Sequence, residues 1–177
     1  MPTLDETGAW AGGWAWAELR LFEVVGGWVA AAPEPAAKAL LAAQSRHHAE
    51  RAEAWLGHRP VVAGRDPEDL VVPSSEGVAA ALAALADPEP AGTAERLAAL
   101  VRVVLPRLAT AYRDRLDVAL AHPITDEALA RSLRWAVADT LEDWVAAERL
   151  LQSLLRTGDD VAKASAHAAR VESLLVT

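Results

Sequence analysis

The sequence predicts an all-α protein, and three observations lead to this expectation. Hydrophobic residues make up 53% of the 177 residues, and most of them are alanine, leucine or valine. Alanine, leucine, glutamate and arginine favour helices, while the aromatic residues that strands favour are sparse apart from seven tryptophans. Apolar residues recur at spacings of three and four between prolines and glycines, which is the pattern of amphipathic helices. A chain of this length is one domain of ordinary size and can bury a full core.

The composition excludes several kinds of function. Without cysteine there are no disulfides, thiolate nucleophiles, zinc–thiolate sites or iron–sulfur clusters. The net charge of −8 argues against a general role in binding nucleic acid, because phosphate contacts require a positive surface. Glu18, Arg20 and Glu23 interrupt the first apolar stretch before the ~18 consecutive apolar residues of a membrane span, and no signal-peptide pattern precedes it. We expect a soluble cytoplasmic protein that binds neither nucleic acid nor membranes.

The first helix is expected over about residues 8–31. Glu18 lies on its apolar face, four residues after Trp14 and three before Leu21, and therefore presents a carboxylate to the interior. Four glycines weaken this helix by up to ~1 kcal/mol each relative to alanine. We expect them where a neighbour approaches closely or the helix bends. The other residues of the apolar face are Trp10, Val25 and Trp28.

A second helix is expected over residues 34–56. It starts at the prolines of Pro33-Glu34-Pro35, and the connection is so short that the first two helices must form an antiparallel hairpin. Gln44 and His48 fall on its apolar stripe. An unpaired buried polar group costs roughly 1–3 kcal/mol, so both side chains must find partners on other helices. The rest of the stripe consists of Ala37, Leu41, Ala52 and Trp55.

A long connector follows and contains a short helix at about residues 75–86. The connector is long enough to return the chain to the other end of the bundle, so the next long helix, at about 94–121, lies parallel to the second. Its apolar stripe runs through Val104 to Ala111 and continues onto Arg115. Pro106 lies inside this helix and should kink or break it. Two helices complete the chain, one at about 126–156, antiparallel to its predecessor, and a terminal amphipathic one at about 160–175.

Two segments of the first helices carry a family resemblance. Residues 16–23 read Trp-Ala-Glu-Leu-Arg-Leu-Phe-Glu, and residues 47–53 read His-His-Ala-Glu-Arg-Ala-Glu. Together with the short, long and short connections, these segments resemble the ferritin-like superfamily. The resemblance covers the four long helices. It implies an antiparallel four-helix bundle with one long crossover between the second and third helices, to which the C-terminal helix is added.

Ferritin-like oxidases, hydroxylases and iron stores hold two metal ions with one glutamate from each of the first and third helices and a Glu-x-x-His pair from each of the other two. Glu18 fits the ligand of the first helix, and His48 fits the imidazole of the second. Ser45 stands where the second helix needs its glutamate, and none of the five histidines follows a carboxylate at a distance of three residues. The resemblance therefore implies a bundle without a complete di-metal site. The matching positions on the last two long helices are Tyr112 or Arg115, and Thr140 and Asp143.

The polar side chains on the inner faces are expected to form a buried network of salt bridges and hydrogen bonds where metals would otherwise bind. Arginine suits such a network because its planar fork meets carboxylates two bonds at a time. Desolvation offsets much of the attraction, so the network need not add stability. The expected members are Glu18, Gln44, His48, Arg51, Tyr112, Arg115, Thr140 and Asp143.

Two functions follow from these observations. The first is a non-catalytic binding or scaffold protein without a metal cofactor. It is expected to form a homodimer through the tryptophan-rich first helix or the terminal helix, and to bind a small molecule or a protein. Trp10, Trp14 and Trp16 would then line a pocket or the dimer surface, although tryptophan at helical spacing more often packs in a core.

The alternative is an oxygen-using hydroxylase or oxidase with two iron or manganese ions, which would resemble the tRNA-hydroxylase-like branch of the superfamily. Such an enzyme would need an unorthodox metal site in this chain. Its candidate ligands are Glu18, His47, His48, Glu50 and Asp143.

Overall fold

The computed structural model describes residues 3–61, 63–87, 92–121 and 127–175, and its regular structure is helical throughout these ranges. This confirms the prediction of an all-α fold. None of the helices in the described part combines the length and apolarity needed to cross a bilayer. The long helices are α1 (Leu4–Ala31), α2 (Pro35–Gly57), α5 (Leu105–Leu120), α6 (Glu127–Leu154) and α7 (Gly158–Leu174), and the shorter elements are η1 (Pro67–Leu70), α3 (Glu76–Ala86), α4 (Thr93–Ala99) and η2 (Leu100–Val104).

The largest difference from the expected helix ends is at the start of α1, which begins at Leu4 rather than at residue 8. Thr3 and Glu6 form a capping box that accounts for the earlier start. The Thr3 hydroxyl accepts a hydrogen bond from the Glu6 N–H at 3.1 Å, and the Glu6 carboxylate accepts one from the Thr3 N–H at 2.7 Å. The short connection expected between the helices at about 94–121 and 126–156 lies outside the described residues.

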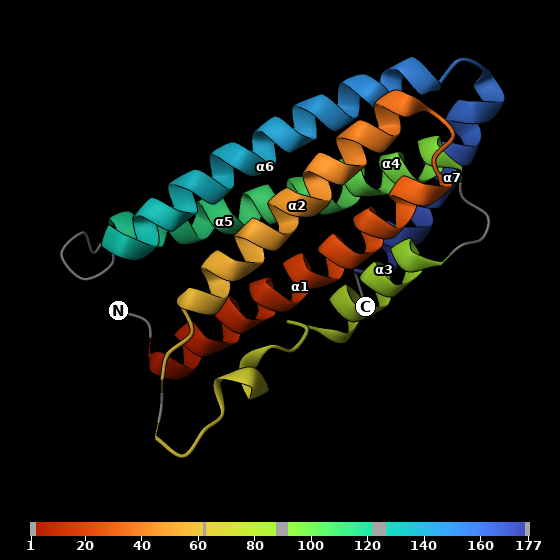
Figure 1. Ribbon diagram of the computed structural model, residues 1–177. Coiled ribbons are helices and arrows are strands. Elements are labelled where there is room, and N and C mark those ends of the chain that lie inside the picture. The colour runs from red at the N-terminus through yellow and green to blue at the C-terminus, as the bar shows by residue number, and fades with distance from the viewer. Residues whose placement is uncertain (1–2, 62, 88–91, 122–126, 176–177) are drawn as a thin grey trace.

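The helices are arranged in two opposite directions. In Figure 1, α1 and α6 run one way, while α2 and the continuous rod of α4, η2 and α5 run the other way. α2 packs on both α1 and α6, and α5 packs on α6. Between α2 and α4 the chain travels from one end of the bundle to the other and contacts α1 through η1 and α3. α7 covers α3 and α4.

Pro106 does not end the helix in which it lies. η2 is a π-helical turn that precedes the proline, and the N–H of Leu105 reaches back to the carbonyl of Leu100. A π turn inserts one extra residue and shifts the helical phase that follows. The buried face therefore continues through Leu105, Leu108 and Tyr112 instead of passing through Ala111 to Arg115, as the sequence periodicity suggested.

The glycines of α1 allow a close approach, as the sequence analysis expected. A Cβ atom at Gly12 would lie 1.9 Å from the carbonyl oxygen of Leu70, because η1 packs directly on this face of α1. A Cβ atom at Gly26 would lie 2.8 Å from the Ser45 hydroxyl on α2. Gly27 has nothing within 4 Å of the same position. Close packing thus explains Gly12 and Gly26 and leaves Gly27 unexplained.

Candidate functional site

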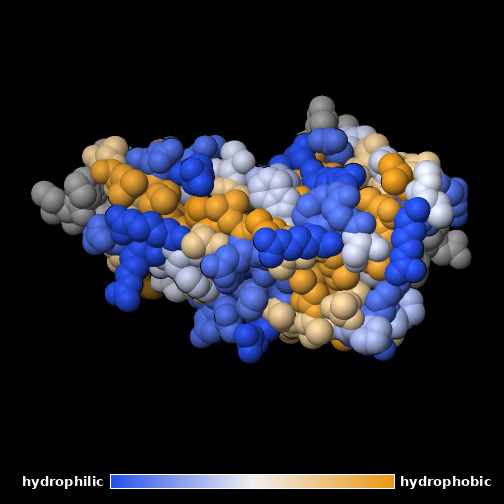
Figure 2. Space-filling view, turned by 90° about the horizontal axis from the view of Figure 1, so that it is seen from above, coloured by the Kyte–Doolittle hydropathy of each residue, from blue (hydrophilic) through white to orange (hydrophobic). Residues whose placement is uncertain are grey.

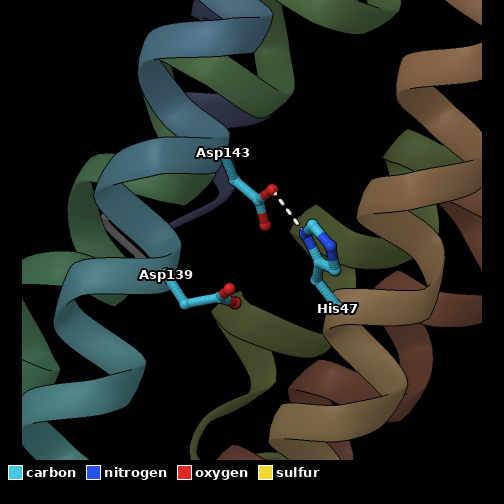
Figure 3. A group of neighbouring side chains, drawn as sticks. All are labelled: His47, Asp139 and Asp143. Carbon is cyan, nitrogen blue, oxygen red and sulfur yellow. Dashed lines mark hydrogen bonds and ion pairs between the residues drawn. The ribbon is translucent and has the colours of Figure 1, made fainter.

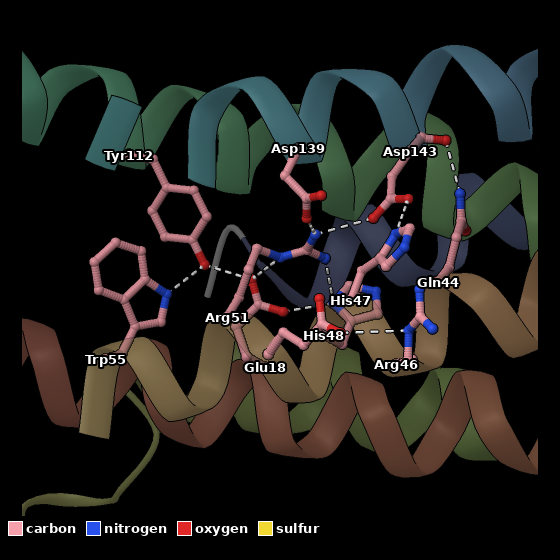
Figure 4. A network of polar contacts seen from close by, with 11 residues as sticks. Glu18, Gln44, Arg46, His47, His48, Arg51, Trp55, Tyr112, Asp139 and Asp143 are labelled. Carbon is pink, nitrogen blue, oxygen red and sulfur yellow. Dashed lines mark hydrogen bonds and ion pairs between the residues drawn. The ribbon is translucent and has the colours of Figure 1, made fainter. Parts of the chain in front are cut away.

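Polar side chains gather at the centre of the bundle, in a core that is otherwise apolar. They lie on the facing sides of α1, α2 and α6, with Tyr112 added from α5 (Figure 4). This is the placement that the helical periodicity of the first two helices predicted for Glu18, Gln44 and His48. Within the described ranges, the buried polar and charged residues are Glu18, Gln44, Ser45, His48, Arg51, Thr140, Asp143 and His167.

Arg51 occupies the middle of this group, and its side chain has no exposed surface. Its Nε donates a hydrogen bond to Glu18 Oε1 at 2.9 Å. Its Nη1 donates to Asp143 Oδ2 at 2.9 Å and also contacts Asp139 Oδ2. One guanidinium thus joins carboxylates from α1 and α6. Arginine remains protonated at any physiological pH, so this positive charge is permanent.

Glu18 accepts hydrogen bonds on both carboxylate oxygens. The Tyr112 hydroxyl donates to Oε1 at 2.5 Å and itself accepts a hydrogen bond from Trp55 Nε1 at 3.1 Å. Oε2 lies 2.5 Å from His48 Nδ1. Each Glu18 oxygen therefore has at least one partner, and these partners come from α2 (His48 and Arg51) and α5 (Tyr112).

His48 Nδ1 faces a carboxylate and a guanidinium at the same time, at 2.5 Å from Glu18 Oε2 and 2.8 Å from Arg51 Nη2. An ionised carboxylate only accepts hydrogen bonds, so the Glu18 contact needs a proton on Nδ1. A guanidinium only donates, so the contact with Arg51 Nη2 is then a close approach of two donors rather than a hydrogen bond. His48 Nε2 is buried and has no hydrogen-bond partner in the described part of the chain. The imidazole therefore orients Glu18 through one nitrogen only.

These contacts fix the charges of the three central groups at neutral pH. Burial raises the pKa of Glu18, but the Arg51 charge and the hydrogen bonds from His48 and Tyr112 outweigh it and bring this pKa to about 2. Burial opposes the charge of Arg51, yet Glu18 and Asp143 raise the pKa of Arg51 above its ordinary value. Burial and the neighbouring Glu18 raise the pKa of Tyr112 well above 10. Glu18 is therefore anionic, Arg51 cationic and Tyr112 neutral.

The outer edge of the network carries a second group of side chains. His47 Nδ1 lies 2.8 Å from Asp143 Oδ1, and Asp139 stands one turn earlier on α6 (Figure 3). One ligand-type atom from each of these three residues lies within 4.8 Å of the other two. Gln44 Nε2 donates to the backbone carbonyl of Asp143 at 2.7 Å. A histidine and two carboxylates in this arrangement are potential metal ligands.

Six of the eight residues expected in the network are joined by the contacts above. Thr140 is buried as expected, but its hydroxyl has no hydrogen-bond partner among the described residues. Arg115 lies elsewhere, with its guanidinium carbon 4.6 Å from the centre of the Trp10 ring. The π turn before α5 explains this position, because it rotates Arg115 away from the seam that carries Tyr112.

The candidate ligands of the alternative di-metal site do not all lie together. Glu50 is exposed and pairs with Arg46 on its own helix, 3.3 Å away. Glu18 and His48 satisfy each other, while His47 belongs to the outer edge. Asp139 was missed by the sequence analysis. Its position four residues before Asp143 places both carboxylates on one side of α6, which is a signal that could have identified it.

An apolar cavity of about 150 Å³ lies beside the network, between α1, α3 and α5. Trp14 forms part of its wall and packs edge-on against Tyr112, with 4.9 Å between ring centres. A single aromatic ring therefore separates the cavity from the residues that bind Glu18. Other residues of the wall are Leu21, Val78, Leu82, Val104 and Leu108.

Comparisons with known proteins place the chain in no family. No protein-family model matches it, and neither the curated proteins nor the solved structures gave a significant match.

Proposed function

We propose that this chain is a non-catalytic binding or scaffold protein of the ferritin-like type, whose core holds Arg51 where other members hold metal ions. The observation that carries the proposal is the buried guanidinium of Arg51, bonded to carboxylates from both α1 and α6. In a di-metal protein, the carboxylates of the bundle neutralise metal cations. Here a permanently charged side chain supplies positive charge among the carboxylates.

The directions of the helices support the resemblance on which this proposal draws. α2 and the α4–α5 rod run the same way, and a long segment links them (Figure 1). A bundle with one crossover in the middle would have its second and third long helices in this parallel arrangement, so these directions support the proposal.

The contacts of Glu18 and His48 favour a structural over a catalytic role. Both Glu18 oxygens already accept hydrogen bonds from buried side chains. An incoming metal ion would therefore have to compete with these partners. Glu50 points to solvent and is paired with Arg46. A reactive di-metal centre would require Glu18, His48 and Glu50 to break their present hydrogen bonds and ion pairs.

The binding part of the proposal draws on the cavity beside Trp14. Apolar cavities of about this volume bind molecules the size of benzene. We propose a small apolar molecule as the ligand, and binding should change the fluorescence of Trp14. Replacing Leu82 by Phe would fill the cavity and should abolish the change, whereas replacing Leu19, which is exposed on α1, should not.

As a scaffold, the protein is expected to form a homodimer. Figure 2 shows the face on the side of α6, where hydrophobic residues form patches between hydrophilic ones. Exposed apolar side chains also occur on the two helices proposed for the contact, with Leu19 and Phe22 on α1 and Val161 on α7. Light scattering that shows only a monomer at high concentration would contradict this part.

Elemental analysis and oxygen consumption test the proposal against the oxidase. Protein grown with iron and manganese and purified without chelator should hold no more than one ion per chain. Added Fe²⁺ should be oxidised no faster than without the protein. Two ions per chain and catalysed oxygen consumption, both lost in a His48→Ala variant, would establish the di-metal enzyme instead.

A further inference from the structure

The side chains at the outer edge of the network are of types that bind cations. We infer that His47, Asp139 and Asp143 bind one divalent transition-metal ion of the Zn²⁺ or Mn²⁺ type. One ligand atom from each residue already lies within 4.8 Å of the other two (Figure 3). Imidazole and carboxylate are the ligands that such ions accept, and a fourth position is left for water.

The distances between these ligand atoms suit a single ion. Metal–ligand bonds of about 2.0–2.2 Å in a tetrahedral site place two ligand atoms roughly 3.4 Å apart. His47 Nδ1 and Asp143 Oδ1 now lie 2.8 Å apart, so they need to separate only slightly. Asp139 projects from the same side of α6 one turn earlier, and one oxygen of its carboxylate lies within 4.8 Å of the other two ligand atoms, while its Oδ2 contacts Arg51.

The balance of charge favours a divalent cation. Glu18, Asp139 and Asp143 contribute three negative charges, and Arg51 contributes one positive charge. Counted without the histidines, the network carries an excess of two negative charges in a largely buried position. Such an excess is costly away from water. One divalent ion cancels it.

Arg51 does not block this site completely, because a carboxylate has two oxygens. Arg51 Nη1 binds Oδ2 of Asp143, whereas Oδ1 of the same carboxylate faces His47. Asp143 can therefore bind Arg51 and an ion at the same time. In that arrangement Arg51 holds the ligand in orientation, a role that neighbours of metal ligands often play.

Gln44 supplies a second observation, a buried oxygen without a hydrogen-bond partner beside Asp143. It lies one turn before His47 on α2, and its amide nitrogen donates to the backbone carbonyl of Asp143. Its carboxamide oxygen is buried and has no hydrogen-bond partner among the described residues. An oxygen of this kind can accept a hydrogen bond from water bound to the ion. The ion itself can enter from solvent, because the side chains of His47 and Asp139 are 27% and 19% exposed.

Metal titration of the full chain tests the inference. Protein freed of metal with a chelator is titrated with Zn²⁺ by calorimetry and with Co²⁺ by visible absorption. We expect one ion per chain. His47→Gln and, separately, Asp139→Asn should each weaken binding at least tenfold. Asp139→Asn changes a half-buried side chain and keeps its size, so it tests the site even if His47→Gln folds poorly.

His58→Gln is the matched control. His58 lies at the C-terminal end of α2, and its Nε2 contacts the Ser132 hydroxyl at 2.8 Å instead of the network. This variant should bind Zn²⁺ and Co²⁺ as the parent does. An equal loss of metal affinity in His58→Gln and His47→Gln would overturn the inference. Metal binding that neither His47→Gln nor Asp139→Asn weakens would also overturn it.

The inference rests on the proposed function, because it assumes that Glu18 and Arg51 stay paired. The metal-site inference and the proposed function can fail separately in the same titration. No binding would overturn the outer site and leave the proposed function intact. Two ions per chain that both disappear in Glu18→Gln would show a di-metal centre and would overturn the proposed function together with the one-ion site.

Discussion

Arg51 Nε donates a hydrogen bond to Glu18 Oε1 at 2.9 Å, and neither side chain is exposed to solvent. This buried ion pair links α1 to α2, and contacts from Arg51 to Asp139 and Asp143 extend it to α6. Removal of one partner from such a pair leaves an uncompensated charge and typically costs 3–5 kcal/mol, whereas replacing a whole pair can be neutral. The network is therefore sensitive to single substitutions.

Glu18→Gln should lower the free energy of unfolding by about 3 kcal/mol, because Arg51 loses one of its carboxylates and the Tyr112 hydroxyl loses a charged acceptor. Chemical denaturation measures the change. Glu50→Gln is the control, since Glu50 is exposed and paired only with Arg46, and its effect should stay within about 0.5 kcal/mol. Equal stability of the parent and Glu18→Gln would count against the network.

Acid should remove the stabilisation that the ionised Glu18 carboxylate provides. The pKa of Glu18 is about 2 in the folded protein against an ordinary value of 4.5, so the unfolded chain binds the proton more readily. The stabilisation is complete above pH 4.5 and is lost as the pH falls from about 4.5 towards 2. The difference in unfolding free energy between the parent and Glu18→Gln should shrink over this window. A constant difference would contradict the assigned pKa.

His58 should make stability depend on pH in a higher range. Burial lowers the pKa of His58 below 6.5, so the unfolded chain again binds more protons. The free energy of unfolding should fall as the pH falls through about 6.5. His58→Gln should weaken this dependence, measured as thermal unfolding between pH 5 and 8. His167, whose pKa is lowered by burial in the same direction, would account for a remaining slope.

Two glycines of α1 should respond to alanine in opposite ways. A Cβ atom at Gly12 would collide with the Leu70 carbonyl, and moving η1 away should cost about 1–3 kcal/mol. At Gly27 there is open space, and alanine should stabilise the helix by up to about 1 kcal/mol. Thermal unfolding of both variants measures whether each substitution raises or lowers the stability. A Gly12→Ala variant that is as stable as the parent would mean that η1 does not rest on Gly12.

The helical period sufficed to predict the inner half of the network. Glu18 and His48 interrupt otherwise apolar stripes of α1 and α2, so their burial and need for partners follow from spacing alone. Arg115 was misplaced because sequence periodicity assumes a regular α-helix, while the π turn of η2 moves the seam of α5 by one residue. Asp139 was missed because it stands at the edge of the buried face of α6, where an acid is ordinarily solvated. Its partner, Arg51, is defined only by the packing of α2 against α6.

A double-mutant cycle between Glu18→Gln and Arg51→Met, carried out in the presence of a chelator, tests most directly whether a buried ion network holds the bundle core together without metal. Each single variant should be strongly destabilised. The double variant should be less destabilised than the sum of the two by about 1–3 kcal/mol, because it removes both charges of the pair. Effects that add to within about 0.5 kcal/mol would show that Glu18 and Arg51 act independently, and would contradict the account.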